Sequence, residues 1–142
     1  MDKITSFTKD HDKLNEGLYI SMQMQGITTY DLRFKKPNTE FITTSSSHTI
    51  EHLLATLLRN SEQKNNIIYF GPMGCRTGFY LLTTNLNINE VKKILIDCIK
   101  KSLLLEEIPG NKKIECGNYL DHDLNGAKKE LTNYLHILGD LK

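Results

Sequence analysis

The chain has 142 residues, of which 39% are hydrophobic and 25% are charged, and its formal net charge at pH 7 is +1. This length supports one hydrophobic core, so we expect a single domain over residues 1–142. The balanced charge excludes the basic surface of a nucleic-acid-binding protein, and the apolar runs are too short to span a membrane. Three widely spaced cysteines and an N-terminus without a signal-peptide pattern predict a cytoplasmic protein with reduced thiols.

The first half of the chain predicts two strands followed by a helix. Residues 18–24 and 30–35 alternate apolar and polar side chains, which is the pattern of half-buried strands. Pro37 and the following asparagine end the second strand in a turn. The serines at 45–47 offer N-cap oxygens to a helix over about 46–60, in which leucines recur at helical spacing.

The second half predicts two more strands and two helices. A short apolar run and a segment rich in aromatic and β-branched residues indicate the strands. Asn87 and Glu90 have the spacing of a capping box at the start of the first helix, and the second helix is amphipathic. In chain order, these four elements cover residues 67–70, 77–84, 88–107 and 124–138.

The order of these elements indicates the fold class. The strands come in adjacent pairs, and helices follow each pair. This order predicts an α+β two-layer sandwich, with an antiparallel or mixed sheet of about four strands covered by helices on one face. A doubly wound α/β fold is disfavoured because strands and helices do not alternate regularly.

The pattern His48-Thr49-Ile50-Glu51-His52 lies at the start of the 46–60 helix. Residues four apart lie on nearly one helix face, so both imidazoles can point at one metal ion. Glu51 lies at the edge of that face and can transfer protons beside the metal without binding it. The pattern therefore predicts a metal site with an acid–base group next to it.

A catalytic metal usually has three protein ligands and one open position, so a third ligand must come from elsewhere. Cys116 offers a thiolate from a loop that has no apolar periodicity. His122, six residues later, is an alternative ligand, although its position also suits a helix cap or a surface residue.

The other two cysteines have different surroundings. Cys75 lies in a turn between glycines and next to Arg76, which suits a thiol that transfers protons. Cys98 lies on the apolar face of the 88–107 helix, so we expect it to pack in the core and to have no catalytic function.

Six segments, in one order between about residue 5 and residue 138, carry a joint pattern. They are Ser6-Phe7-x-x-Asp10-His11, Asp31-Leu-Arg33-Phe34-Lys-Lys-Pro37-Asn38, His48-Thr-Ile-Glu-His52-Leu-Leu, Pro72-Met-Gly-Cys75-Arg-Thr-Gly-Phe-Tyr80, Glu115-Cys116-Gly117 and His122-Asp-Leu-Asn-Gly-Ala127. Together they resemble the S-ribosylhomocysteine lyases, the LuxS family. The resemblance implies cleavage of S-ribosylhomocysteine to homocysteine and 4,5-dihydroxypentane-2,3-dione, the precursor of autoinducer 2. The family reaction is metal-assisted carbonyl migration followed by β-elimination.

The resemblance also implies the roles of individual residues. One divalent metal ion per subunit, Fe(II) in the family and exchangeable for Zn(II) or Co(II), would be held by His48, His52 and Cys116. Glu51 and Cys75 would be the two acid–base groups. The family is a homodimer with active sites at the subunit interface. The residues implied in substrate binding are Ser6 and His11, reaching over from the partner subunit, and Arg33 and Arg59.

Residues 69–71 are one of three departures from the family, besides a short connection between the first two strands and an early end at Lys142, and two other functions compete with the lyase. Residues 69–71 read Tyr69-Phe70-Gly71 where the family usually has an acid, which would lie near the amino-acid end of the substrate. The H-x-x-E-H pattern also occurs in inverzincin metallopeptidases, but these need a carboxylate as third ligand. The remaining alternative is a non-catalytic metal-binding descendant of the lyase.

Overall fold

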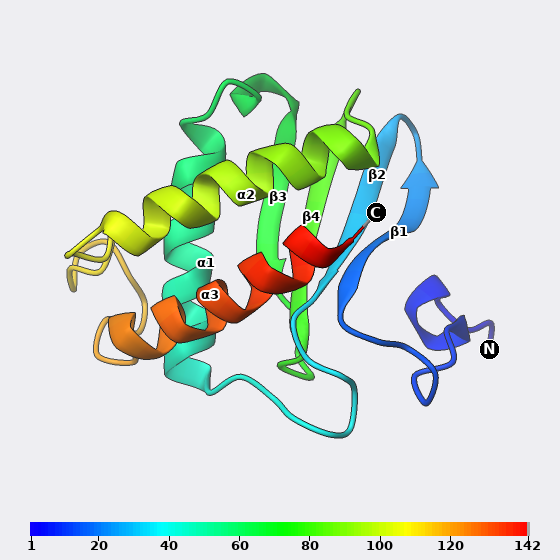
Figure 1. Cartoon of the computed structure of the whole chain (residues 1–142), viewed down its shortest axis with the longest axis horizontal. Coiled ribbons are helices and arrows are strands. Elements are labelled where there is room, and N and C mark those ends of the chain that lie inside the picture. The colour runs from blue at the N-terminus through cyan, green and yellow to red at the C-terminus, as the bar shows by residue number, and fades with distance from the viewer. Residues whose placement is uncertain (142) are drawn as a thin grey trace.

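The sheet has four antiparallel strands in the order β1-β2-β4-β3 in the computed structural model, which describes residues 1–141 (Figure 1). The strands are β1 (Gly17–Met24), β2 (Ile27–Arg33), β3 (Ile67–Pro72) and β4 (Gly78–Thr84). The two predicted strand pairs are therefore two hairpins, joined where β2 pairs with β4. The central strand β2 carries the residues that later organise one half of the candidate site.

Three helices cover one face of this sheet, as Figure 1 shows. They are α1 (Thr44–Arg59), α2 (Ile88–Leu104) and α3 (Leu124–Asp140), and two short 3-10 helices are η1 (Thr5–Thr8) and η2 (Lys64–Asn66). The architecture confirms the predicted α+β sandwich with helices on one face. No helix in the part of the chain that the structure describes is long and apolar enough to cross a membrane.

Two helix ends differ from the sequence prediction. The N-cap of α1 is Thr43, whose side chain accepts a hydrogen bond from the backbone N–H of Ser46, so the serines lie inside the first turn. Helix α2 begins with the predicted capping box but ends at Leu104 rather than near residue 107. Glu106 and Glu107 would place two negative charges at the negative end of the helix dipole, which disfavours its extension.

The core lies between the sheet and the helices. Its fully buried side chains include Leu32 and Leu81 from the sheet and Leu54 and Leu131 from the helices. Cys98 is 1% exposed, which confirms the prediction that it packs in the core. Because the core uses only one face of the sheet, the opposite face is left for other contacts.

That opposite face is partly covered by the N-terminal arm, which we define as residues 1–16. The Ser6 hydroxyl accepts a hydrogen bond from Tyr80 on β4, and the Thr5 hydroxyl contacts the sulfur of Met22 on β1. Between the arm and the sheet lies a cavity of about 960 Å³, which we call the arm cavity. Met24 and Tyr69 at its rim are more than half exposed.

Candidate active site

Four potential metal ligands converge at the outer side of α1. His48 and His52 come from α1, and Cys116 and His122 come from the loop between α2 and α3. The Cys116 sulfur lies 3.4 Å from Nε2 of His48 and 3.8 Å from Nε2 of both His52 and His122. A tetrahedral ion with usual bond lengths separates sulfur and nitrogen ligands by about 3.5 Å, so the spacing fits a metal site. We call these four residues the metal group.

Hydrogen bonds orient the two helix histidines toward the thiol. Nδ1 of His48 lies 2.9 Å from the carbonyl oxygen of Asp121, and Nδ1 of His52 lies 2.8 Å from that of Pro109. A carbonyl oxygen only accepts, so each Nδ1 carries the proton and each Nε2 presents its lone pair. A Cβ on Gly110 would lie only 3.3 Å from Nδ1 of His52, so the missing side chain leaves room for this ring.

Thr49 orients the third histidine in the same way. Its hydroxyl donates to the carbonyl of Ser45 at 3.0 Å and accepts from the backbone N–H of Asp123 at 2.9 Å. The hydroxyl has no second proton, so Nδ1 of His122, 2.9 Å away, donates to it. Burial, together with His48 and His52, lowers the pKa of His122, which favours the neutral ring that a metal ligand needs.

The structure therefore brings Cys116 and His122 to the same place, although the sequence presented them as alternatives. Three imidazoles and one thiol are ligand groups that suit Zn(II), Fe(II) or Co(II). Among the described residues of the metal group there is no carboxylate, which an inverzincin metallopeptidase would use as its third ligand. Glu51 lies beside the group, with Oε1 4.0 Å from Nε2 of His52.

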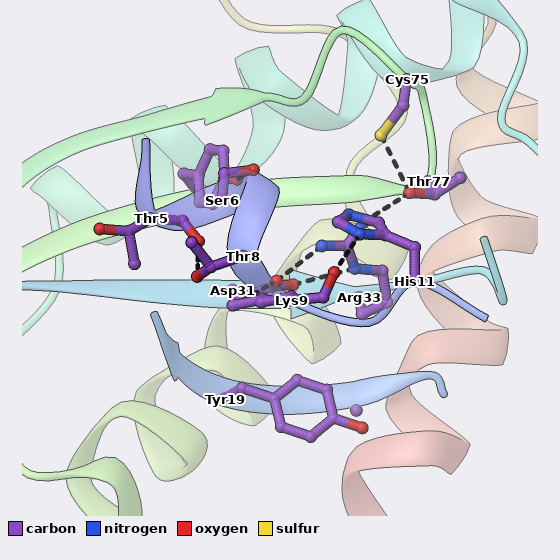
Figure 2. Close-up of polar contacts among 12 residues, drawn as sticks. Thr5, Ser6, Thr8, Lys9, His11, Tyr19, Asp31, Arg33, Cys75 and Thr77 are labelled. Carbon is purple, nitrogen blue, oxygen red and sulfur yellow. Dashed lines mark hydrogen bonds and ion pairs between the residues drawn. The ribbon is translucent and has the colours of Figure 1, made fainter. Parts of the chain in front are cut away.

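Cys75 lies in the turn between β3 and β4 and is exposed. Its sulfur is 3.1 Å from the hydroxyl of Thr77, and that hydroxyl accepts a hydrogen bond of 2.8 Å from Arg33 (Figure 2). The guanidinium of Arg76, the neighbour that the sequence suggested as the charge beside the thiol, packs over the ring of Phe41. The thiol thus contacts a buried cation through Thr77.

Arg33 is almost fully enclosed. Its side chain is 2% exposed and forms two hydrogen bonds with the carboxylate of Asp31, of 3.1 Å and 2.6 Å. The same carboxylate oxygen accepts from Lys9 of the N-terminal arm at 3.0 Å. Sequence reasoning missed Asp31, Thr77 and Lys9. The sequence held a signal for Asp31 only: the Asp31-x-Arg33 spacing puts both side chains on one face of a strand.

The predicted substrate-binding residues separate into two places. Ser6, His11 and Arg33 line the arm cavity together with Cys75 of the same chain. Tyr69 also lines it, and a Cβ on Gly71 would overlap the Tyr69 side chain. Arg59 is exposed at the end of α1, where it donates to the carbonyl of Ala55, and it does not line this cavity.

The metal group and the arm cavity are separate in one chain. Across residues 1–141, neither the metal group nor Glu51 belongs to the lining of the arm cavity. His48 and Ile50 are two residues apart on α1, so at about 100° per residue their side chains point about 160° apart. Ile50 packs in the core, so His48 points away from the core. Figure 1 shows the N-terminal arm and the loop before α3 on opposite sides of the molecule.

Comparison with known proteins identifies the family. The sequence model of S-ribosylhomocysteinase (LuxS) matches residues 4–140. The chain belongs to the LuxS family. A protein of Borrelia garinii subsp. bavariensis named S-ribosylhomocysteine lyase is 50% identical, over 100% of this chain and 96% of its own length. Relatives of the same name from Finegoldia magna and Clostridium beijerinckii are each 42% identical, over 100% and 96% of this chain and 95% and 91% of their own lengths. Membership of this family disfavours the metallopeptidase, and full-length identity of up to 50% to proteins named S-ribosylhomocysteine lyase supports the lyase.

The two cysteines Cys75 and Cys98 should differ sharply in reactivity. Burial raises the pKa of the Cys98 thiol to about 11, so it stays protonated at neutral pH, whereas Cys75 is exposed. Brief treatment of the native protein with iodoacetamide near neutral pH should label Cys75 and leave Cys98 unlabelled, as read by peptide mass spectrometry. Labelling of Cys98 at a similar rate would contradict the buried position.

Proposed function

We propose that this chain cleaves S-ribosylhomocysteine to homocysteine and 4,5-dihydroxypentane-2,3-dione. The observation that carries the proposal is the metal group with Glu51 beside it, in a chain of the LuxS family. The thioether is a poor leaving group from an unactivated sugar carbon but leaves readily when it is β to a carbonyl. The carbonyl must therefore move along the ribose before the carbon–sulfur bond breaks.

Moving the carbonyl requires two groups that exchange protons with the sugar. Each step removes a proton from the carbon next to the carbonyl and returns one to the neighbouring carbon or oxygen. A bound divalent ion supplies Lewis-acid stabilisation of the negative charge that develops on the sugar oxygens. We assign the proton transfers to Glu51 beside the metal group and to the Cys75 thiol. The last step expels homocysteine as the thiolate, which then takes up a proton.

We propose one metal ion per subunit, bound by His48, His52 and Cys116, with Fe(II) as the natural ion and Zn(II) or Co(II) as replacements. The orientation of the Nε2 lone pairs toward the thiol supports this assignment. Zinc has the higher intrinsic affinity for such ligands, so iron occupancy would depend on the metal supply of the cytoplasm, where we place the reaction.

We propose a homodimer in which each active site combines two protomers. The metal group and Glu51 would come from one protomer, and the arm cavity with Cys75 from the other. The supporting observation is their separation in one chain, together with the sheet face that the helices leave uncovered. Ser6, His11 and Arg33 would then surround the ribose, and Arg59 and Tyr69 would determine how the homocysteine end binds.

Removal of the proposed third ligand should remove the metal. Cys116→Ala should contain little metal by elemental analysis after anaerobic purification, because the variant loses the one anionic ligand among the described residues of the metal group. His136→Ala is the control, since this histidine is exposed on α3. Full occupancy in Cys116→Ala would reject the assignment and transfer the role to His122.

Loss of either acid–base group should abolish most of the turnover. Cys75→Ala and Glu51→Gln should each release homocysteine at least about a hundredfold more slowly while keeping the metal, because one positioned acid–base group contributes about 10²–10⁴-fold. The thiol of free homocysteine reports the rate, and Cys98→Ala is the matched control with near wild-type turnover. Normal turnover in Cys75→Ala would refute the two-group mechanism.

Mixing two inactive variants tests whether sites are shared between protomers. In a heterodimer of Cys75→Ala and Glu51→Gln, one shared site receives both native groups and the other receives neither. After subunit exchange, a random mixture should recover about a quarter of wild-type activity. If both groups of a site came from the same chain, no mixture would recover activity.

A further inference from the structure

Thr77 has no part in the reaction as proposed, yet it lies between the reactive thiol and a buried cation. Thr77 is buried, with 5% of its surface exposed. Its hydroxyl oxygen lies 3.1 Å from the sulfur of Cys75 and 2.8 Å from Nη1 of Arg33. Figure 2 shows the sulfur, the hydroxyl and the guanidinium in sequence. The directions of these hydrogen bonds determine what Thr77 does to the thiol.

Donor and acceptor chemistry assigns those directions. A guanidinium only donates, so the Thr77 oxygen accepts the hydrogen bond from Arg33. The hydroxyl keeps one proton, and the Cys75 sulfur is the acceptor within reach. Donation to Arg33 is impossible, and donation to sulfur is most favourable when the sulfur is negatively charged. The arrangement therefore stabilises the thiolate form of Cys75.

The charges behind Thr77 have the sign that this role requires. Asp31 pairs with Arg33 at 2.6 Å and with Lys9 at 3.0 Å, and its side chain is fully buried. Two cations share one carboxylate, so the cluster has one net positive charge. Arg33, Asp31 and Thr77 are buried although the thiol itself is exposed, so solvent screens this charge less than it screens a charge on an exposed side chain.

We propose that Thr77 is a positioning residue that links Cys75 to the Asp31–Arg33–Lys9 cluster and holds the thiol as a reactive thiolate. The inference rests on the role of Cys75 in the proposed function, and it adds the residue that prepares this group. The N-terminal arm also contributes to the charge cluster beside Cys75, because the arm supplies Lys9.

Other ionisable groups also face the thiol and enter its pH response. Cys75 lines two cavities, and Arg76 follows it in the chain. The ionisable groups of these cavities, in addition to Arg33, are Lys3, His11, Glu40, Tyr69 and Tyr80. Of these, His11 is the imidazole. Its Nδ1 donates to the carbonyl of Lys9 at 2.9 Å, and it is unchanged in every variant of the test below. Differences between variants therefore report Thr77 and Lys9 rather than His11.

The test measures how fast iodoacetamide alkylates Cys75 between about pH 5 and pH 9, by mass spectrometry of its peptide. Thr77→Val keeps the shape of the side chain but removes the hydroxyl. Its profile should move to higher pH, and its rate near pH 6 should fall about tenfold, as expected for loss of a hydrogen bond to a charged group. Thr77→Ser restores the hydroxyl and should remain within about twofold of the wild type.

Thr83→Val is the matched control. Thr83 lies on β4, the strand that follows Thr77, is fully buried, and its hydroxyl has no hydrogen-bond partner among the residues that the structure describes. Its alkylation profile should equal that of the wild type. A thermal unfolding curve for each variant shows that the fold is intact.

A second variant keeps the proposal testable if Thr77→Val does not fold. Lys9→Met removes one positive charge from the arm and should slow alkylation near pH 6 about threefold, because the field at the thiol weakens. An unchanged profile in folded Thr77→Val, or in Lys9→Met when Thr77→Val is unfolded, would overturn the inference. Alkylation needs no substrate, so this result is independent of whether the chain acts as a lyase.

Discussion

The hydroxyl of Thr49 joins the two parts of the chain that form the metal group. It bonds Ser45 on its own helix, the backbone of Asp123 and the ring of His122, and so fastens the start of α3 to α1. Gly126 allows this close packing, because a Cβ there would overlap the Ser46 hydroxyl. Together with the bonds from His48 to Asp121 and from His52 to Pro109, this junction holds the loop that carries Cys116 beside the two helix histidines.

The other half of the site depends on a buried charge cluster on the central strand β2. Asp31 and Arg33 are 0% and 2% exposed, and breaking such a pair leaves an uncompensated buried charge. Each of the three guanidinium nitrogens of Arg33 already donates a hydrogen bond, two of them to Asp31 and one to Thr77. Arg33 thus organises the surroundings of Cys75 as well as the wall of the arm cavity.

The two halves suit a reaction that needs proton transfer by two separate groups. The metal group with Glu51 lies at the outer side of α1, and Cys75 lies at the end of the sheet hairpin. If the two halves met across a subunit interface, the sugar would lie between two sets of groups. One would be the metal with Glu51, and the other the Cys75 thiol with Arg33 behind it. A dimer would also cover the exposed apolar side chains of β1 and β3, such as Met24 and Tyr69.

The sequence by itself determined the features that depend on neighbours along the chain. The period of apolar residues predicted the strands and helices, the spacing of His48 and His52 predicted two ligands on one helix face, and the helical position of Cys98 predicted its burial. Family resemblance supplied the chemistry. Only the tertiary structure decided that His122 joins Cys116, that Arg33 is buried against Asp31, and that Thr77 contacts Cys75. The contacts that bring these pairs into place join distant segments: Cys116 with His48, 68 residues apart, His122 with Thr49, 73 apart, and Arg33 with Thr77, 44 apart. They arise because α3 packs on α1 and β2 pairs with β4, and this packing determines which side chains meet. The local periodicity of the sequence does not predict which elements pack together.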